Sequence, residues 1–217
     1  MDIHLTEEEQ VEAIKKWWKD NAKSVIGGIL IGLAVIYGGR TWFEQKNNHV
    51  ELASATYQSM IQDMQQSNSA NAAEKASLLL GQYSDTPYST LAALTMAKIK
   101  VDEDNPVGAK SHLRWALDHS DQADLKHIAR LRLVRVLISE GNTEEAMALI
   151  ESVDFGKYAA SYQELKGDAL VAKGQIDQAK GAYNLALQSL DPGSRLRSYI
   201  EIKLDNLGEK DIETGES

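Results

Sequence analysis

Histidines, which bind metal ions and transfer protons in many enzymes, are few in this chain. His112 and His119 are seven residues apart, so they can share one face of a helix. A metal ion held there would need a third ligand, such as Asp121 or Asp124, and no ligand motif supports that site. We therefore interpret both histidines as solvated polar residues and predict no metal site.

Acidic residues gather at Asp102-Glu103-Asp104, which resembles the start of a calcium-binding loop. The glycine and terminal glutamate of such a loop are missing and Pro106 follows closely, so we interpret the segment as a helix cap.

The chain has no cysteine, which excludes a thiol nucleophile. The sequence contains none of the motifs that are typical of phosphate-binding loops, zinc proteases or serine nucleophiles. We predict a non-enzyme without a cofactor; the open alternative is a membrane-bound hydrolase using acids distant in sequence.

Arginines form the densest basic group in the second part of the chain. Arg130, Arg132 and Arg135 are close in sequence, and the last two can meet on one helical face. They could bind an acidic partner. However, residues 47–217 contain 17 Lys and Arg against 25 Asp and Glu, a net charge of −8, which favours ion pairing with the chain's own acids. The same balance argues against nucleic acid as a partner.

An uncharged run of 16 residues, 24–39, lies between Lys23 and Arg40 in a chain with a mean hydropathy of −0.36. A buried core helix would show a polar face, whereas the only polar groups here are Ser24 and the Tyr37 hydroxyl. A cleaved signal peptide has a short basic lead, whereas 23 residues containing six acids precede this run. The sequence therefore predicts a membrane anchor.

The length and flanks of the run agree with a single membrane span. Residues 22–43 would rise about 33 Å as a helix, against a hydrocarbon core of about 30 Å, if Lys23 and Arg40 extend toward water. Trp18 and Trp42 fit aromatic belts at the two interfaces. Four cations precede the span and two follow it: Lys15, Lys16, Lys19 and Lys23, then Arg40 and Lys46. This asymmetry predicts a cytoplasmic N-terminus and a single-pass type II protein.

Small residues recur within the span at Ser24, Gly28, Gly32 and Gly39, near one helical face. A Gly-x-x-x-Gly pair allows two membrane helices to approach closely. Glycine is also common in membrane helices that only anchor a protein. We expect this face to pack on a partner's transmembrane helix, with simple anchoring as the alternative.

The rest of the chain reads as helices divided by proline, glycine and short polar runs, without hairpin-strand signals. We expect helices over residues 51–66, 72–83, 88–101, 107–119, about 121–139, 144–151, 156–173, 175–189 and from 191 to about 207. The predicted fold class is all-α: one N-terminal transmembrane helix followed by a tetratricopeptide-like helical-hairpin solenoid.

A recurring spacing supports the solenoid. Gly141 and Gly174 are 33 residues apart, as are Ala146 and Ala179. Small residues allow two helices to approach closely and a large residue fills the groove of the neighbour. The predicted repeat-packing residues are Ala109, Leu113, Ala116, Gly141, Ala146, Gly167, Gly174, Ala179, Tyr183 and Ala186. An ordinary antiparallel helix pair, which can also show an alanine stripe, is the alternative. Only the 156–190 unit matches the tetratricopeptide pattern at several positions.

Four sequence pieces resemble the YfgM family, the ancillary subunit of the SecYEG translocon. They are EQVEAIKKWW at 9–18 and RTW at 40–42, with LRLVRV at 131–136 and KGDALVAKG at 166–174. The resemblance covers about residues 8–207 and is specific only in combination. It implies a protein of the bacterial inner membrane with cytoplasmic residues 1–21, a transmembrane helix over 22–43 and a periplasmic repeat domain over 44–207. Residues 208–217 would be an acidic flexible tail outside the resemblance.

The resemblance also implies partners. These are the SecYEG translocon, the membrane-anchored periplasmic chaperone PpiD, exported client proteins that are passed to periplasmic chaperones, and a cytoplasmic stress-response regulator at the N-terminal segment. The leading hypothesis is thus a membrane-anchored, chaperone-type interaction protein. A repeat scaffold for another envelope assembly complex is the alternative. Client identity and the partner-binding face do not follow from the sequence.

Overall fold

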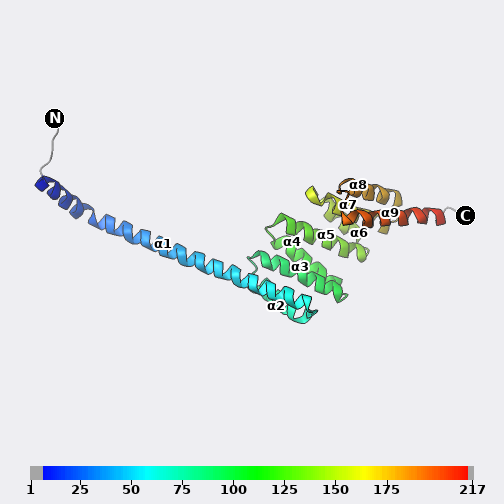
Figure 1. Cartoon of the computed structure of the whole chain (residues 1–217), viewed down its shortest axis with the longest axis horizontal. Helices are drawn as coiled ribbons and strands as arrows, with labels where there is room; N and C mark the ends of the chain where they lie inside the picture. Colours follow the sequence, from blue (N-terminus) through cyan, green and yellow to red (C-terminus); the bar gives the residue numbers. More distant parts are fainter. Residues whose placement is uncertain (1–6, 215–217) are drawn as a thin grey trace, which may run out of the picture. The chain divides into compact units, whose positions relative to one another are not determined.

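The computed structural model describes residues 7–214, and within this range the chain is helical and contains no strand. The all-α prediction is thereby confirmed. In chain order (Figure 1) the elements are α1 (Glu7–Gln65), α2 (Ser69–Gln82), α3 (Pro87–Asp102), α4 (Pro106–His119), α5 (Ala123–Ser139), α6 (Thr143–Glu151), the 3-10 turn η1 (Gly156–Tyr158), α7 (Ala159–Ala172), α8 (Ile176–Gln188) and α9 (Arg195–Thr214).

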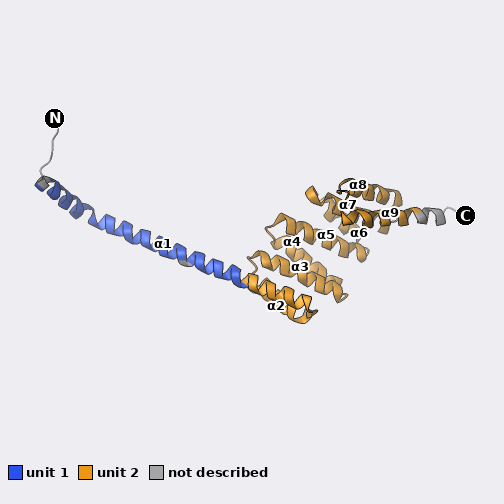
Figure 2. Ribbon diagram, viewed as in Figure 1, with its two compact units in different colours: residues 1–52 blue, residues 53–217 orange. Residues whose placement is uncertain are grey.

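The chain forms two compact units, Met1–Leu52 and Ala53–Ser217 (Figure 2). The first consists, in its described part, of the N-terminal portion of α1. The predicted boundaries at 21/22 and 43/44 both fall inside α1, a helix of 59 residues. The second unit begins with the last turns of α1 and contains α2–α9, in which consecutive helices pack against each other as hairpins.

Four hairpin turns share one backbone motif. Each of these turns contains one residue with a positive φ, which is in chain order Ser67, Asp104, Gly141 and Gly174, at 59°, 55°, 77° and 74°. At each turn two backbone bonds close the preceding helix; for example, Gly174 N donates to Val171 O at 2.9 Å and Gln175 N to Leu170 O at 2.9 Å. This is the Schellman C-cap. The turns are spaced by 37, 37 and 33 residues along the sequence, so the repeat extends over more of the chain than the sequence pattern alone indicated.

The residue that follows each positive-φ residue is the N-cap of the next helix. The Asn105 side chain accepts a hydrogen bond from Gly108 N at 2.9 Å, and Pro106 occupies the first helical position, as the cap interpretation of this segment predicted. Asn68 accepts in the same way from Asn71 N at 3.4 Å. This cap starts α2 at Ser69, three residues before the predicted start.

Three other helix starts and one helix end differ from the predictions by two or more residues. The helix predicted over 156–173 begins with the 3-10 turn η1, and α7 starts only at Ala159. Neither Ser120 nor Asp121 caps α5; Ser120 Oγ accepts instead from Gln122 N at 3.2 Å, and the helix starts at Ala123. The last helix starts at Arg195, because the chain turns after Asp191 and Ser194 Oγ accepts from Leu196 N at 3.3 Å. This helix also continues to Thr214, into the predicted tail.

Three clusters of buried side chains form the core of the second unit. The first joins the end of α1 to α2 and α3, the second joins α3 to α7, and the third joins α7 to α9. Many of the fully buried residues are alanines, including Ala72, Ala93, Ala116 and Ala129. Alanine at these contacts brings the helix backbones close together, so the hairpins stack side by side.

Replacement of Ser67 by glycine is predicted to stabilise the first hairpin. A residue with a Cβ is strained at positive φ by about 1–2 kcal/mol, and glycine is not, although glycine loses more backbone entropy on folding. We expect Ser67→Gly to raise the free energy of unfolding by about 1 kcal/mol in thermal unfolding of the full chain followed by circular dichroism. The matched control, Gly174→Ala, should lower it by a similar amount. A lower stability for Ser67→Gly would contradict the common turn motif.

Candidate functional site

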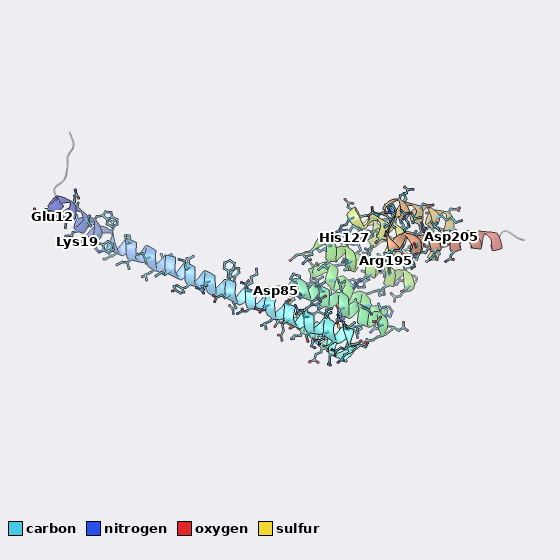
Figure 3. The ribbon with its side chains drawn as sticks, in the orientation of Figure 1. Glu12, Lys19, Asp85, His127, Arg195 and Asp205 are labelled. Atoms are coloured by element: carbon cyan, nitrogen blue, oxygen red, sulfur yellow. The ribbon has the colours of Figure 1, made fainter. Side chains whose placement is uncertain are left out.

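The first candidate surface is the apolar stretch of α1. The helix contains a segment long and apolar enough to cross a membrane, and none of that segment is buried within the protein. Ile31 and Val35 are each 68% exposed, and other large apolar side chains along this stretch are exposed too (Figure 3). Apolar area of this extent needs a cover other than water, and a lipid bilayer provides one along the whole segment.

Aromatic and charged side chains flank this segment. The Trp17 and Trp18 ring centroids are 6.4 Å apart at one end, and those of Trp42 and Phe43 are 5.1 Å apart at the other. Glu12 and Lys19 lie near the N-terminal end of α1 (Figure 3). Among the cations beyond the span, Arg40 Nε is bonded to Glu44 at 2.9 Å, and Lys46 Nζ lies 5.5 Å from the Trp42 ring centroid.

The predicted membrane-packing residues all lie on α1. Ser24 and Gly28 are exposed, and Gly32 and Gly39 are partly exposed. A Cβ built on Gly28, Gly32 or Gly39 would meet no atom within 4 Å. The packing of this chain itself therefore does not require glycine at these positions, which leaves their role to be tested with a partner helix.

The second candidate surface is the repeat stack, in which α7 and α8 approach closely at Gly167. A Cβ on Gly167 would come within 2.3 Å of Tyr183 Cε1, so only glycine leaves room for this ring. Tyr183 is 2% exposed and donates from its hydroxyl to Asp168 Oδ1 at 2.7 Å. Burial and then the Asp168 carboxylate raise the pKa of Tyr183, which stays a neutral donor. Ala179 and Ala186 are fully buried beside it on α8.

The other predicted packing residues divide into two kinds. Ala109, Leu113, Ala116 and Ala146 are buried in the cluster that joins α3 to α7. Gly141 and Gly174 do not pack: a Cβ on either would meet nothing within 4 Å, and their contribution is the positive φ of the turn. The sequence analysis counted Gly141 and Gly174 among the packing residues, whereas this geometry gives them a role in the turns instead.

An ionic cluster joins α7 to α9, and the sequence reasoning missed it. Lys203 Nζ on α9 pairs with Glu164 and, at 2.6 Å, with Asp168 Oδ1, both on α7. The Glu164 side chain is 1% exposed, and burial raises the pKa of this carboxyl despite the nearby cations. Burial opposes the charge of Lys203, but the hydrogen bonds that its ammonium group donates to the Asp168 and Glu164 carboxylates raise its pKa. Glu164 and Lys203 are 39 residues apart, so no local sequence signal predicts that they pair. The one sign in the sequence was an acidic residue, Glu164, on the buried face of a predicted helix.

Two of the residues considered as metal ligands, His119 and Asp124, make contacts with other side chains instead. The His119 ring stacks on Trp115 with centroids 4.3 Å apart, and its Nδ1 lies 3.0 Å from Trp115 O. Burial, and then Lys100, lower the pKa of His112. Asp124 pairs with Lys157 at 2.8 Å. Within residues 7–214 no group of three His, Asp or Glu side chains is arranged to hold a metal ion.

The arginine group is paired less completely than predicted. Arg135 pairs with Glu164 at 3.4 Å, as expected from the excess of acids. Arg132 instead donates to the backbone oxygen of Leu94 at 3.3 Å, and the described part of the chain offers it no carboxylate within 4 Å. Arg130 Nε is buried without a hydrogen-bond partner among the same residues. The expectation of internal ion pairing is thus met at Arg135 and wrong at Arg132.

Comparison with known proteins covers both candidate surfaces. The family described as tetratricopeptide repeat-like domain matches residues 15–209. Proteins named ancillary SecYEG translocon subunit are similar over 95% of this chain: one from Haemophilus influenzae at 31% identity over its whole length, one from Escherichia coli at 28% over 99% of its length, and one from Aggregatibacter actinomycetemcomitans at 29% over its whole length. No solved structure matches the chain.

The Gly167 contact yields a stability prediction. Gly167→Ala should lower the free energy of unfolding by about 1–3 kcal/mol, because the added methyl group overlaps the buried ring of Tyr183. Gly181→Ala on α8 is the control, since its Cβ would meet nothing within 4 Å and alanine favours the helix. Thermal unfolding of the full chain measures both. Equal unfolding temperatures for the two variants would show that the α7–α8 contact is looser than described.

Proposed function

Since the chain belongs to the family of ancillary SecYEG translocon subunits, we propose that it is a membrane-anchored, non-catalytic interaction protein that associates with the Sec translocon. The observation that carries this proposal is the extent of the similarity, which includes the apolar helix as well as the repeats. The repeats supply surfaces for protein contact and the apolar helix supplies attachment to the membrane.

We place the anchor over residues 22–43 in the bacterial inner membrane with residues 1–21 in the cytoplasm. Four lysines precede the uncharged run 24–39, whereas the two cations that follow this run are Arg40, paired with Glu44, and Lys46, which lies against the Trp42 ring. The positive-inside preference supports this orientation. The repeat domain over 44–207 and the tail over 208–217 then lie in the periplasm.

In this position the repeat domain would receive exported proteins as they leave the translocon and pass them to periplasmic chaperones, with PpiD as the anchored chaperone beside it. The family resemblance supports this hand-over, as it supports contact between the cytoplasmic segment and a stress-response regulator. The stacked hairpins are suited to the task, because a solenoid offers a long surface to extended segments.

The orientation predicts a protease pattern. In spheroplasts, protease added from outside should digest the chain beyond about residue 50 and leave the N-terminal segment protected, because the bilayer shields the cytoplasmic side. Detection of tags at the two ends by immunoblotting measures this, with a cytoplasmic marker protein as the control for intact membranes. Protection of the C-terminal tag would rule out the proposed orientation and the periplasmic hand-over.

The glycine face predicts a partner contact within the membrane. Gly28→Leu with Gly32→Leu should abolish co-purification of the translocon or of the anchored chaperone in mild detergent, while membrane insertion persists, because leucine keeps two helix backbones apart. The control is Ile29→Val with Leu33→Val, which changes the same turns and leaves the glycines in place. Equal co-purification of the two variants would leave the span as an anchor only.

A further inference from the structure

A groove on the second unit combines an apolar floor with cations at its edge. It lies where α3 and α5 meet above α4 and has a volume of about 240 Å³. Its lining residues are Ala97, Lys98, Val101, Leu113, Arg132, Arg135 and Val136. This volume is below the roughly 300–1,000 Å³ of sites for drug-sized ligands, so the groove is suited to single side chains of a partner.

The floor of the groove is suited to an apolar side chain. Ala97, Leu113 and Val136 are buried in the core cluster and present their remaining surface to the groove. Val101 stands at the edge, is 51% exposed, and lies on the last turn of α3. A side chain placed against these four residues would remove apolar area from water on both partners, which favours binding.

The cations at the edge are not neutralised equally by this chain. Lys98 pairs with Asp102 at 2.6 Å. Arg135 reaches Glu164 only at 3.4 Å, its side chain remains 53% exposed, and Glu164 is shared with Lys203. Arg132 is bonded to a backbone oxygen and, among the residues that the structure describes, has no carboxylate partner. Positive charge at the groove therefore remains available to a ligand in a unit with a net negative charge.

The two arginines also lie close enough to disfavour each other's charge. Burial, and then the neighbouring Arg135, lower the pKa of Arg132. A carboxylate placed between them would relieve this repulsion and could accept paired hydrogen bonds from a guanidinium fork. A phosphate-rich polymer or an anionic membrane surface fits poorly, because the surrounding unit carries 25 acids against 17 basic residues over 47–217.

From this arrangement we infer that the α3–α5 groove binds an extended segment of another polypeptide in which a carboxylate side chain is adjacent to a large apolar side chain. The apolar side chain lies on the floor formed by Ala97, Leu113 and Val136, and the carboxylate lies between Arg132 and Arg135. This inference rests on the proposed function, because it assigns a ligand chemistry to the repeat domain of an interaction protein. It selects among exported segments by their acidic and apolar residues.

A peptide-binding measurement tests the groove in the full chain, purified in detergent. The probe is a short fluorescent peptide of Gly and Ser with Glu-Leu-Glu at its centre, compared with otherwise identical peptides that carry Gln-Leu-Gln or Glu-Ser-Glu. Fluorescence anisotropy should show binding at least about tenfold tighter for Glu-Leu-Glu than for either comparison peptide. Equal affinity for the three peptides, or no binding of any, would overturn the inference.

Variants locate the binding in the groove. Val101→Asp adds a negative charge at an exposed edge position and should weaken Glu-Leu-Glu binding at least about tenfold, whereas Val101→Lys should retain it. Val107→Asp is the matched control, because Val107 is also exposed, at 72%, and does not line the groove. Arg132→Gln should abolish the preference for Glu over Gln. Equal effects of Val101→Asp and Val107→Asp would place the binding elsewhere and overturn the inference.

Co-purification of the translocon with Val101→Asp separates this inference from the proposed function. The translocon contact assigned to the α1 span does not involve Val101, so co-purification should be unchanged. If the translocon co-purifies but the peptides show no preference, the groove inference fails and the proposed function stands. If the wild-type chain fails to co-purify with the translocon, the proposed function fails independently of the peptide result.

Discussion

Close approach of helix backbones at small residues is the constraint on which the repeat domain depends. At Gly167 the α7 backbone lies so near the Tyr183 ring that no Cβ fits between them. Alanines such as Ala109, Ala146 and Ala179 are fully buried at equivalent contacts. Larger residues there would separate the helices and open the core that joins one hairpin to the next. The stack, its groove and its ionic cluster all follow from this spacing.

The same physical argument gives a different result on α1. Gly28, Gly32 and Gly39 are also small residues on a helix face, but among the residues that the structure describes no other segment packs on them. In the repeats the close-packing surfaces are filled within the chain, whereas on the span they are available to another helix. Under the proposed function the two units have two tasks: the span would attach to a membrane partner, and the repeats would contact polypeptide segments outside the membrane.

Local signals were sufficient to predict the helices and most of their ends. Pro106 with Asn105 before it, and Gly141 with Asn142 after it, fix their turns through backbone geometry that neighbouring residues determine. Ser67 and Asp104 hold the positive φ of their turns in place of glycine, so the recurrence of the same turn motif was less visible at these two positions. The turn spacing of 37 residues extends the repeat to these hairpins.

Contacts between distant residues could not be predicted in the same way. The pairing of Lys203 with Glu164 depends on how α9 returns to α7, and the incomplete pairing of Arg132 depends on which acids the fold brings near it. The excess of acids in the composition predicted internal partners for all three arginines. Within the described residues the fold gives only Arg135 a carboxylate partner, Glu164. Positive charge therefore remains at the groove.

Site-specific photocrosslinking in living cells tests the central claim most directly, namely that the span attaches the chain to the translocon while the repeats contact polypeptide segments. A photoreactive residue at Gly28 and another at Val101 would report the two surfaces separately. The account predicts that crosslinks from Gly28 give a translocon subunit or an anchored chaperone, and that those from Val101 give exported polypeptides. Crosslinks from Gly28 to lipid alone, together with none from Val101 to any polypeptide, would contradict it.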